Sequence, residues 1–314
     1  MGSKQRTLAS SITFSGKGLH TGEIVTMTVH PAEANAGIVF RRVDLKDCPE
    51  VAALAHNVCD TSRGTTIKSG KAKVSTIEHI MAALWTMGVD NALIDIDAPE
   101  VPIMDGSARE YSIEIEKTGT VELDAERLYF EVKEEFLFEI PKKGVEVRIT
   151  PAEEYSVNVN VDYNSTVVGR QNARYDSSVS FKEEIAPCRT FVFLHEIEIL
   201  LKLGLIKGGS VENAIVVVEK PISEGTKRRI CKTFGREDIE AEKGYLNHLT
   251  LRFENEIARH KLLDILGDLS LLGRRIKGHV EALRPGHLAN TQMAKQLEEK
   301  MVAEEESKDN ESND

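Results

Sequence analysis

The chain has 314 residues, of which 41% are hydrophobic and 29% charged, so we expect a soluble protein with a substantial apolar core. No apolar run approaches the roughly 18 residues of a membrane-spanning helix, and the amino-terminus lacks the apolar stretch of a secretion signal, which predicts a cytoplasmic location without an integral membrane segment. The net charge of −11 argues against nucleic-acid binding, and four cysteines without CxxC spacing indicate reduced thiols.

Residues 22–40 alternate between apolar and polar side chains around a Pro-containing turn, which predicts two strands. GEIVTMTVHPAE at 22–33 has an echo in GVEVRITPAEEY at 144–155, since each is an alternating strand running into Pro-Ala-Glu. We interpret the echo as an α+β fold of two similar domains, each a sheet packed with helices, although two unrelated hairpins could share the pattern. The polar stretch 116–127 is the predicted join, giving domains at 1–122 and 123–294.

Residues 74–88 have the pattern of a helix. Ser75 is a candidate N-cap, and Glu78 follows three residues later as in a capping box. The apolar side chains recur at helical spacing at Ile80, Ala83, Leu84 and Met87. Residues 91–97 then alternate like a strand.

The second predicted domain contains strands within 128–180, a helix near 195–203, strands near 214–219 and a long helix from about residue 255. The tail at 295–314 begins with a helical pattern and carries eight acidic and three basic residues. We expect most of this tail to be disordered, because a charged, uncapped run has little apolar surface to bury.

The helical segment RHKLLDILGD at 259–268 places a histidine and two aspartates on one face. His260, Asp264 and Asp268 are four residues apart, so their side chains stack along the helix. A buried carboxylate needs a cation, a metal ion or several hydrogen-bond donors. His260 could still be an ordinary hydrogen-bonded histidine, and Asp264 its partner.

A histidine and a carboxylate at this spacing can also point at one metal ion, as the two histidines of HExxH do. A hydrolytic zinc site needs a third ligand and a general base, and His79 preceded by Glu78 could supply both. The same two-histidine, one-carboxylate set occurs in non-haem iron oxygenases. Glu78 favours hydrolysis, because an oxygenase needs no general base beside that ligand.

Two further residues could complete such a site. His287 follows a Pro-Gly turn, and Asp268 could orient and charge its imidazole, although an exposed loop histidine is the simpler interpretation. Thr190, in CRTF, could donate a hydrogen bond to an oxyanion or be merely structural.

Several segments are recognisable together, in order and spacing: GLHTGE (18–23), VSTIEHIMAAL (74–84), EVPIMDGSA (100–108), CRTF (188–191), GLIKGGSVENAIVV (204–217), LRFENEIARHKLLDILGDL (251–269) and GH (286–287). With these motifs the chain resembles the UDP-3-O-acyl-N-acetylglucosamine deacetylase family, from about Gln5 to about Gln296. The family consists of zinc enzymes that hydrolyse the N-acetyl group of UDP-3-O-acyl-N-acetylglucosamine, the first committed step of lipid A synthesis. The resemblance implies two similarly folded domains with the active site between them.

The resemblance also implies roles for individual residues. His79, His260 and Asp264 match the zinc ligands, and Glu78 matches the general base. His287 matches the general acid or charged stabiliser, Asp268 its partner, Thr190 the oxyanion donor and Lys261 a substrate-binding lysine.

An apolar passage for the acyl chain is implied by the same resemblance. The matching residues are Phe191, Phe193, Ile197, Leu200 and Gly209, although an ordinary core helix would give the same apolar pattern. A fatty acyl chain gains roughly 0.8 kcal/mol per buried methylene. We expect a monomer that binds an acylated UDP-amino sugar. Some family members are fused to a dehydratase domain, which we do not expect in a chain of this length. A protein that binds such sugars without catalysis, or a different amidohydrolase, is the alternative.

Overall fold

The computed structural model describes residues 4–203, 205, 207–235, 237 and 239–311. Its amino-terminal half is built on a mixed five-stranded sheet in the order β2–β3–β9–β4–β5. Only the β4–β9 pair of this sheet is parallel. The strands are β2 (Ile12–Lys17), β3 (Ile24–Pro31), β9 (Ala92–Ile96), β4 (Ile38–Arg42) and β5 (Glu50–Ala52).

The carboxy-terminal half repeats this topology. Its sheet has the order β12–β13–β20–β14–β15, and again only one pair, β14–β20, is parallel. The strands of the sequence echo, β3 and β13, occupy equivalent places in the two sheets. The predicted α+β class with similar halves is therefore confirmed. The strands are β12 (Phe136–Ile140), β13 (Val145–Thr150), β20 (His279–Leu283), β14 (Ser156–Asp162) and β15 (Arg170–Tyr175).

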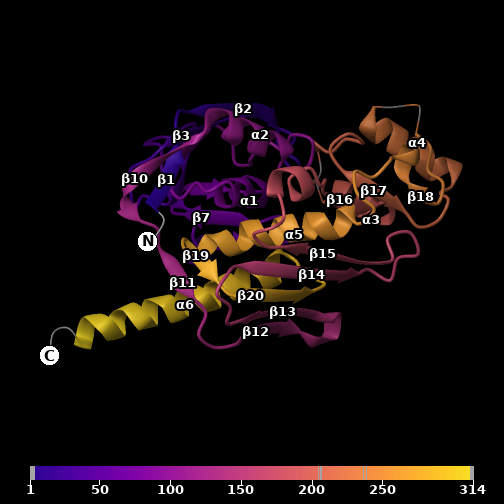
Figure 1. Ribbon diagram of the computed structural model, residues 1–314. Helices are drawn as coiled ribbons and strands as arrows, with labels where there is room; N and C mark the ends of the chain where they lie inside the picture. Colours follow the sequence, from indigo (N-terminus) through magenta and orange to yellow (C-terminus); the bar gives the residue numbers. More distant parts are fainter. Residues whose placement is uncertain (1–3, 204, 206, 236, 238, 312–314) are drawn as a thin grey trace.

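Two helices meet between the halves. α1 (Glu78–Thr86) packs against α5 (Glu256–Leu269), and α5 also covers β14 and β15 (Figure 1). Both helices are buried on nearly all sides, because each faces its own sheet and the other helix. α2 (Arg109–Thr118) packs against α1 and β2, and α6 (His287–Glu311) packs against α5 and β12. Any side chain at the α1–α5 contact is thus held by both halves.

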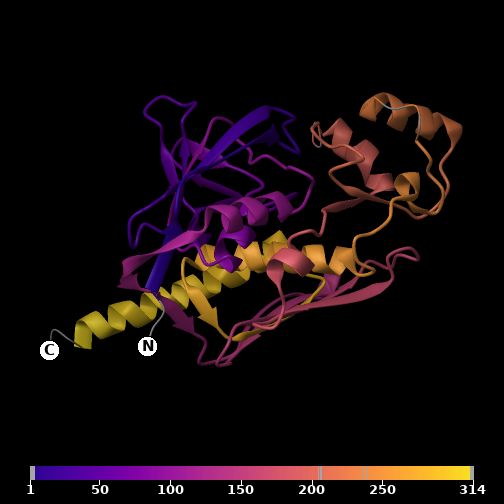
Figure 2. The same cartoon turned by 45° about the horizontal axis from the view of Figure 1, so that its top comes forward.

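Each half carries a smaller sheet as an insert. The first insert is formed by β6 (Val58–Asp60), β7 (Thr66–Ser69) and β8 (Ala72–Val74). The second stands apart at one end of the molecule in both views (Figure 2). It contains β16 (Phe191–Phe193), α3 (Leu194–Lys202), β17 (Ile215–Val218), α4 (Glu224–Phe234) and β18 (Gly244–Tyr245).

The segments that join the halves are themselves paired. β1 (Lys4–Leu8) pairs with β10 (Thr120–Glu126), and β11 (Tyr129–Glu131) pairs with β19 (Arg275–Lys277). The predicted join at 116–127 therefore contains the end of α2 and the whole of β10. The boundary at 122/123 falls inside β10, and the exact division into domains stays a prediction. Short 3₁₀ and π turns complete the chain: η1 (Ala55–Asn57), η2 (Pro141–Lys143), η3 (Phe181–Ile185), η4 (Leu246–His248) and η5 (Ser270–Leu272).

Two local predictions differ from the structure. Ser75 is not an N-cap: α1 begins at Glu78 after Ile77, and the Ser75 hydroxyl donates to the Pro99 carbonyl. The Glu78 carboxylate instead accepts from the Thr65 N–H. The tail is also more helical than predicted, since α6 continues to Glu311.

The helical tail has an apolar anchor and ionic partners. Met293, Ala294 and Leu297 are buried in the core, which fixes the first turns of α6. Further along, Lys300 pairs with Glu134 and Glu305 with Arg274. Across the part of the chain that the structure describes, no helix combines the length and apolarity needed to cross a bilayer.

Candidate metal centre and active site

The structure brings together the three residues predicted as metal ligands. His79 lies in the first turn of α1, and His260 and Asp264 lie one turn apart on α5. Asp264 Oδ1 is 3.8 Å from His79 Nε2 and 3.4 Å from His260 Nε2. One ligand atom from each residue falls within 4.8 Å of the others, and all three residues are buried. This group could hold a metal ion.

The approach of the two helices depends on a glycine. At Gly267, one turn beyond Asp264, an added β-carbon would lie 2.1 Å from the Glu78 carbonyl oxygen. A side chain at this position would therefore push α1 away from α5. The spacing of His260 and Asp264 is fixed within one helix, whereas the place of His79 depends on this contact between helices.

The hydrogen bonds around the three residues leave metal-binding atoms free. His260 Nδ1 lies 3.0 Å from the Cys188 carbonyl, so it is the donor and Nε2 is left with its lone pair. Lys261 Nζ donates to Asp264 Oδ2 at 2.8 Å. Asp264 Oδ1 is buried and accepts no hydrogen bond from any described residue. A buried carboxylate oxygen facing two imidazoles is what a cation would satisfy.

The electrostatics of the group also suit a metal. Burial lowers the pKa of His79 to about 3, which keeps its imidazole neutral. Burial lowers the pKa of His260 as well. Burial opposes ionisation of Asp264, but His260 and Lys261 hold the pKa of this carboxyl well below its usual value. Neutral imidazoles and an ionised carboxylate are the forms that coordinate metal ions.

The buried carboxylate of Glu78 lines the same pocket as the three candidate ligands. Its Oε2 accepts from the Thr65 N–H at 2.9 Å, and its Oε1 lies 3.9 Å from His287 Nε2. Burial raises the pKa of Glu78 to about 7, against the opposing charge of His287. Such a carboxyl exchanges a proton near neutral pH, as a general base requires.

His287 is held by Asp268 as predicted. His287 Nδ1 lies 2.9 Å from Asp268 Oδ2, and the Asn290 amide donates to the same oxygen. The Thr65 hydroxyl donates to the other oxygen, Oδ1. Burial alone would lower the pKa of His287, but the carboxylates of Asp268, Glu78 and Asp264 together outweigh it and raise the pKa to about 9. His287 is therefore cationic at neutral pH.

One pocket opens onto these groups. Besides Glu78 and the three candidate ligands, it is lined by most of the other predicted site residues, namely Thr190, Phe191, Ile197, Leu200, Gly209, Lys261 and His287. Phe193 differs, because it is absent from this lining and borders a neighbouring hollow with Tyr163 and His195. Its ring packs edge-on against Phe191 and Tyr163, so Phe193 supports the pocket wall from behind.

Comparison with known proteins gives one consistent result. Residues 5–236 and 239–299 match the family model for UDP-3-O-acyl N-acetylglycosamine deacetylase (LpxC). The chain belongs to this family. It is 45% identical over 295 residues to the bifunctional enzyme LpxC/FabZ of Bacteroides thetaiotaomicron, covering 94% of this chain and 64% of the relative.

Two more relatives agree. The bifunctional enzyme LpxC/FabZ of Porphyromonas gingivalis is 42% identical over 303 residues, covering 96% of this chain and 66% of the relative. The UDP-3-O-acyl-N-acetylglucosamine deacetylase of Geobacter sp. strain M21 is 42% identical over 295 residues, covering 93% of this chain and 88% of the relative. The chain thus spans just under two thirds of the bifunctional relatives and most of the Geobacter enzyme. The LpxC family resemblance predicted from the motifs is confirmed.

The LpxC-family chain also holds two buried carboxylates that the sequence did not single out. Glu100 accepts from the N–H groups of His20 and Thr21 and from the hydroxyls of Thr21 and Thr76. It thereby fastens the loop of the GLHTGE motif, whose Leu19 carbonyl accepts from the Gly208 N–H. The sequence signal for Glu100 was its position in EVPIMDGSA, because an acidic residue among apolar residues of a matched motif is expected to be buried and to need hydrogen-bond donors.

The second of these carboxylates is Glu256, one turn before His260. Arg189 donates to it through its backbone N–H at 3.0 Å and through Nε at 2.9 Å. Arg189 lies between Cys188, whose carbonyl orients His260, and Thr190, which lines the pocket. The Glu256–Arg189 pair thus attaches Cys188 and Thr190, the neighbours of Arg189, to α5. Because the two partners are 67 positions apart, no local pattern in the sequence indicated the pair.

Proposed function

We propose that this protein hydrolyses the N-acetyl group of UDP-3-O-acyl-N-acetylglucosamine, giving UDP-3-O-acyl-glucosamine and acetate in lipid A synthesis. The observation that carries the proposal is one buried group of His79, His260 and Asp264 beside Glu78, in a member of the LpxC family. The proposal includes zinc as the metal and the cytoplasm as the location.

The candidate ligands suit zinc because they offer two imidazole nitrogens and one carboxylate oxygen, a set found in catalytic zinc sites. The unpartnered Oδ1 of Asp264 supports a cation at this place. A zinc ion held there supplies Lewis acidity, which acidifies water and polarises a carbonyl group. The remaining chemistry belongs to the side chains of the pocket.

Glu78 is proposed as the general base. Its Oε2 is fixed by the Thr65 N–H, so the other oxygen, Oε1, faces the pocket beside His287. As water adds to the acetamide carbonyl carbon, Glu78 takes one of the water protons. The resulting tetrahedral centre carries a negative oxygen, and the carbon–nitrogen bond breaks when the nitrogen receives a proton.

His287 is proposed to stabilise that negative charge and to protonate the leaving amine. Asp268 keeps the imidazole cationic, and Nε2 is the nitrogen that faces Glu78 and the pocket. Glu78 could return its own proton in place of His287. The Thr190 hydroxyl, at the pocket wall, is proposed as a further hydrogen-bond donor to the oxyanion.

The acyl chain is proposed to lie along the apolar wall formed by Phe191, Ile197 and Leu200, with Gly209 leaving room for it. Each methylene buried there contributes roughly 0.8 kcal/mol to binding. Lys261 lines the same pocket and lies 5.5 Å from the Phe191 ring centre, so its ammonium group stands at the polar end of this wall. It is proposed to contact the sugar nucleotide.

The test is incubation of the purified protein with UDP-3-O-acyl-N-acetylglucosamine, followed by mass spectrometry of the sugar nucleotide. We expect loss of one acetyl group with the 3-O-acyl ester retained, and release of acetate. The matched substrate without the 3-O-acyl chain should turn over far more slowly, because it makes no contact with the apolar wall of the pocket. Loss of the ester instead of the acetyl group, or an unchanged substrate, would contradict the proposal.

A further inference from the structure

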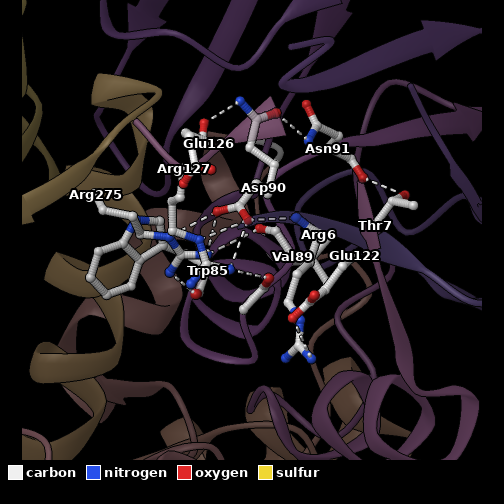
Figure 3. A network of polar contacts seen from close by, with 12 residues as sticks. Arg6, Thr7, Trp85, Val89, Asp90, Asn91, Glu122, Glu126, Arg127 and Arg275 are labelled. Atoms are coloured by element: carbon white, nitrogen blue, oxygen red, sulfur yellow. Dashed lines mark hydrogen bonds and ion pairs between the residues drawn. The ribbon is translucent and has the colours of Figure 1, made fainter. Parts of the chain in front are cut away.

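Asp90 lies in the turn after α1, at the end of the helix opposite Glu78 and His79. Figure 3 shows its carboxylate between two guanidinium groups. Arg127 donates to Oδ2 through Nε and Nη2 at 2.9 and 2.8 Å, and Arg275 donates to Oδ1 through the same two atoms at 3.0 and 2.9 Å. The backbone N–H of Arg6 also donates to Oδ2, at 2.9 Å.

The same two arginines close the carboxyl end of α1. Arg127 Nη2 donates to the Gly88 carbonyl at 2.9 Å, and Arg275 donates to the carbonyls of Trp85 and Val89. The Arg275 guanidinium also lies over the Trp85 ring, 4.8 Å from a ring centre. The last carbonyls of a helix lack partners within it and carry partial negative charge, so these cations satisfy them.

These arginines come from outside the first sheet. Arg127 lies between β10 and β11, in the join of the two halves, and Arg275 begins β19, shortly after α5 and η5. The side chains of Asp90, Arg127 and Arg275 are only 13–15% exposed, so water screens their attraction weakly. The cluster therefore links the end of α1 to the segment that follows α5.

We propose that Asp90 is a positioning residue for the metal centre, holding α1 against the carboxy-terminal half so that His79 stays in place relative to His260 and Asp264. α1 already touches α5 at its amino end, where Gly267 meets the Glu78 carbonyl. α1 also packs along α5 through buried side chains, so the amino-terminal part of the helix is firmly held. The Asp90 cluster provides the second fixed point, about 13 Å away along nine residues of helix.

A positioning role and a purely stabilising role of Asp90 predict different properties of the metal group. Loss of Asp90 leaves two guanidinium groups without their shared carboxylate, which frees the end of α1 and destabilises the fold. Stability alone would leave the metal group unchanged in the folded molecules. Positioning would change the affinity and the coordination geometry even there, because His79 moves relative to its partners.

The experiment compares Asp90→Asn with Asp95→Asn. Asp95 lies in β9 and takes a similar two-bond contact from Arg41, at 2.6 and 2.8 Å, but that pair stays within the first sheet. Apo protein is titrated with Zn²⁺ and with Co²⁺ against a competing chelator, and the visible absorption of the Co²⁺ form is recorded. Thermal unfolding of each variant is measured in parallel.

We expect Asp90→Asn to weaken binding of both metals by about tenfold or more, as changes around metal ligands do, and to alter the Co²⁺ spectrum. Asp95→Asn should lose stability but keep the wild-type affinity and spectrum. Wild-type metal affinity and spectrum in folded Asp90→Asn would overturn the inference. So would equal losses of affinity in both variants.

Arg275→Lys is a milder change that also tests whether the Asp90 cluster positions His79. The ammonium group keeps a positive charge beside Asp90 but loses the fork that also reaches the Trp85 carbonyl. If Asp90→Asn does not fold, this variant decides. A weaker metal affinity with an altered Co²⁺ spectrum supports the inference, and wild-type values for both contradict it. Neither readout requires turnover, so the outcome is independent of the proposed activity.

Discussion

Gly267 of α5 lies so close to Glu78 of α1 that an added β-carbon would come within 2.1 Å of the Glu78 carbonyl oxygen. This contact brings the two helices together at the point where His79 meets His260 and Asp264. The candidate metal centre is therefore formed by the packing of two helices from different halves of the chain, and changes in that packing should change metal binding.

The first prediction concerns Gly267→Ala. The new methyl group must push α1 from α5, so we expect metal content to fall and the free energy of unfolding to drop by about 1–3 kcal/mol, the usual cost of overpacking. Metal analysis and thermal unfolding measure the two effects. Gly225→Ala in α4 is the control, because its β-carbon has no neighbour nearer than 3.8 Å. Full metal content in Gly267→Ala would show that the contact is dispensable.

A second prediction separates the ligand from the base. His79→Ala should lose metal and turnover together, because it removes one of the three proposed ligands. Glu78→Gln should keep the metal and lose turnover by about 10²–10⁴-fold, the usual contribution of a general base. Metal analysis beside steady-state kinetics distinguishes the two patterns. Substantial turnover in metal-loaded Glu78→Gln would remove Glu78 from the mechanism.

The third prediction is a pH dependence set by His287. Its pKa is raised to about 9, above the 6.5 of a free histidine, so its protonated form is complete at neutral pH and is lost as the pH rises through 9. The stability that this charge contributes should therefore decline as the pH rises from about 6.5 to about 9, and activity that depends on the charge should decline as the pH passes 9. In Asp268→Asn the main charge that raises the pKa is gone. The alkaline limb of kcat/KM should therefore move to lower pH, and an unmoved limb would contradict the role of Asp268.

Glu100→Gln gives a fourth prediction. The amide offers only one accepting oxygen to the donors from His20, Thr21 and Thr76, so the loop at Leu19 should loosen. We expect a loss of about 1–3 kcal/mol in stability from the unsatisfied donors. Because Leu19 lines the pocket, KM for the acylated substrate should rise more than kcat falls. Glu139→Gln, at an exposed position, is the control, and equal effects in both variants would contradict the prediction.

Much of the fold could be predicted because its signals are local. The strand echo at 22–33 and 144–155 indicated the repeated sheet, and the spacing of His260 and Asp264 placed both on one face of α5. Local signals failed at Ser75, where a left-handed φ of 60° at Thr76 separates the serine from the start of α1. They also missed the length of α6, whose charged part continues to Glu311 and forms the ion pair of Glu305 with Arg274.

The candidate site was only partly accessible from the sequence. The residues proposed to coordinate or react have distinctive chemistry, and the family motifs indicated them before the fold was known. The residues that hold them in place are ordinary in type and distant in sequence. Thr65 of the first half and Asn290 hold Asp268, and Glu256 holds Arg189, but the partners are 22 to 203 positions apart, so these contacts exist only once the chain has folded.

The most direct test of the account is the metal dependence of deacetylation. The protein is stripped by a chelator, its metal content is measured, and turnover of UDP-3-O-acyl-N-acetylglucosamine is followed before and after addition of Zn²⁺. The account predicts that turnover disappears with the metal and returns with an equimolar amount of Zn²⁺, and that His79→Ala is not rescued. Undiminished turnover by metal-free protein would contradict it.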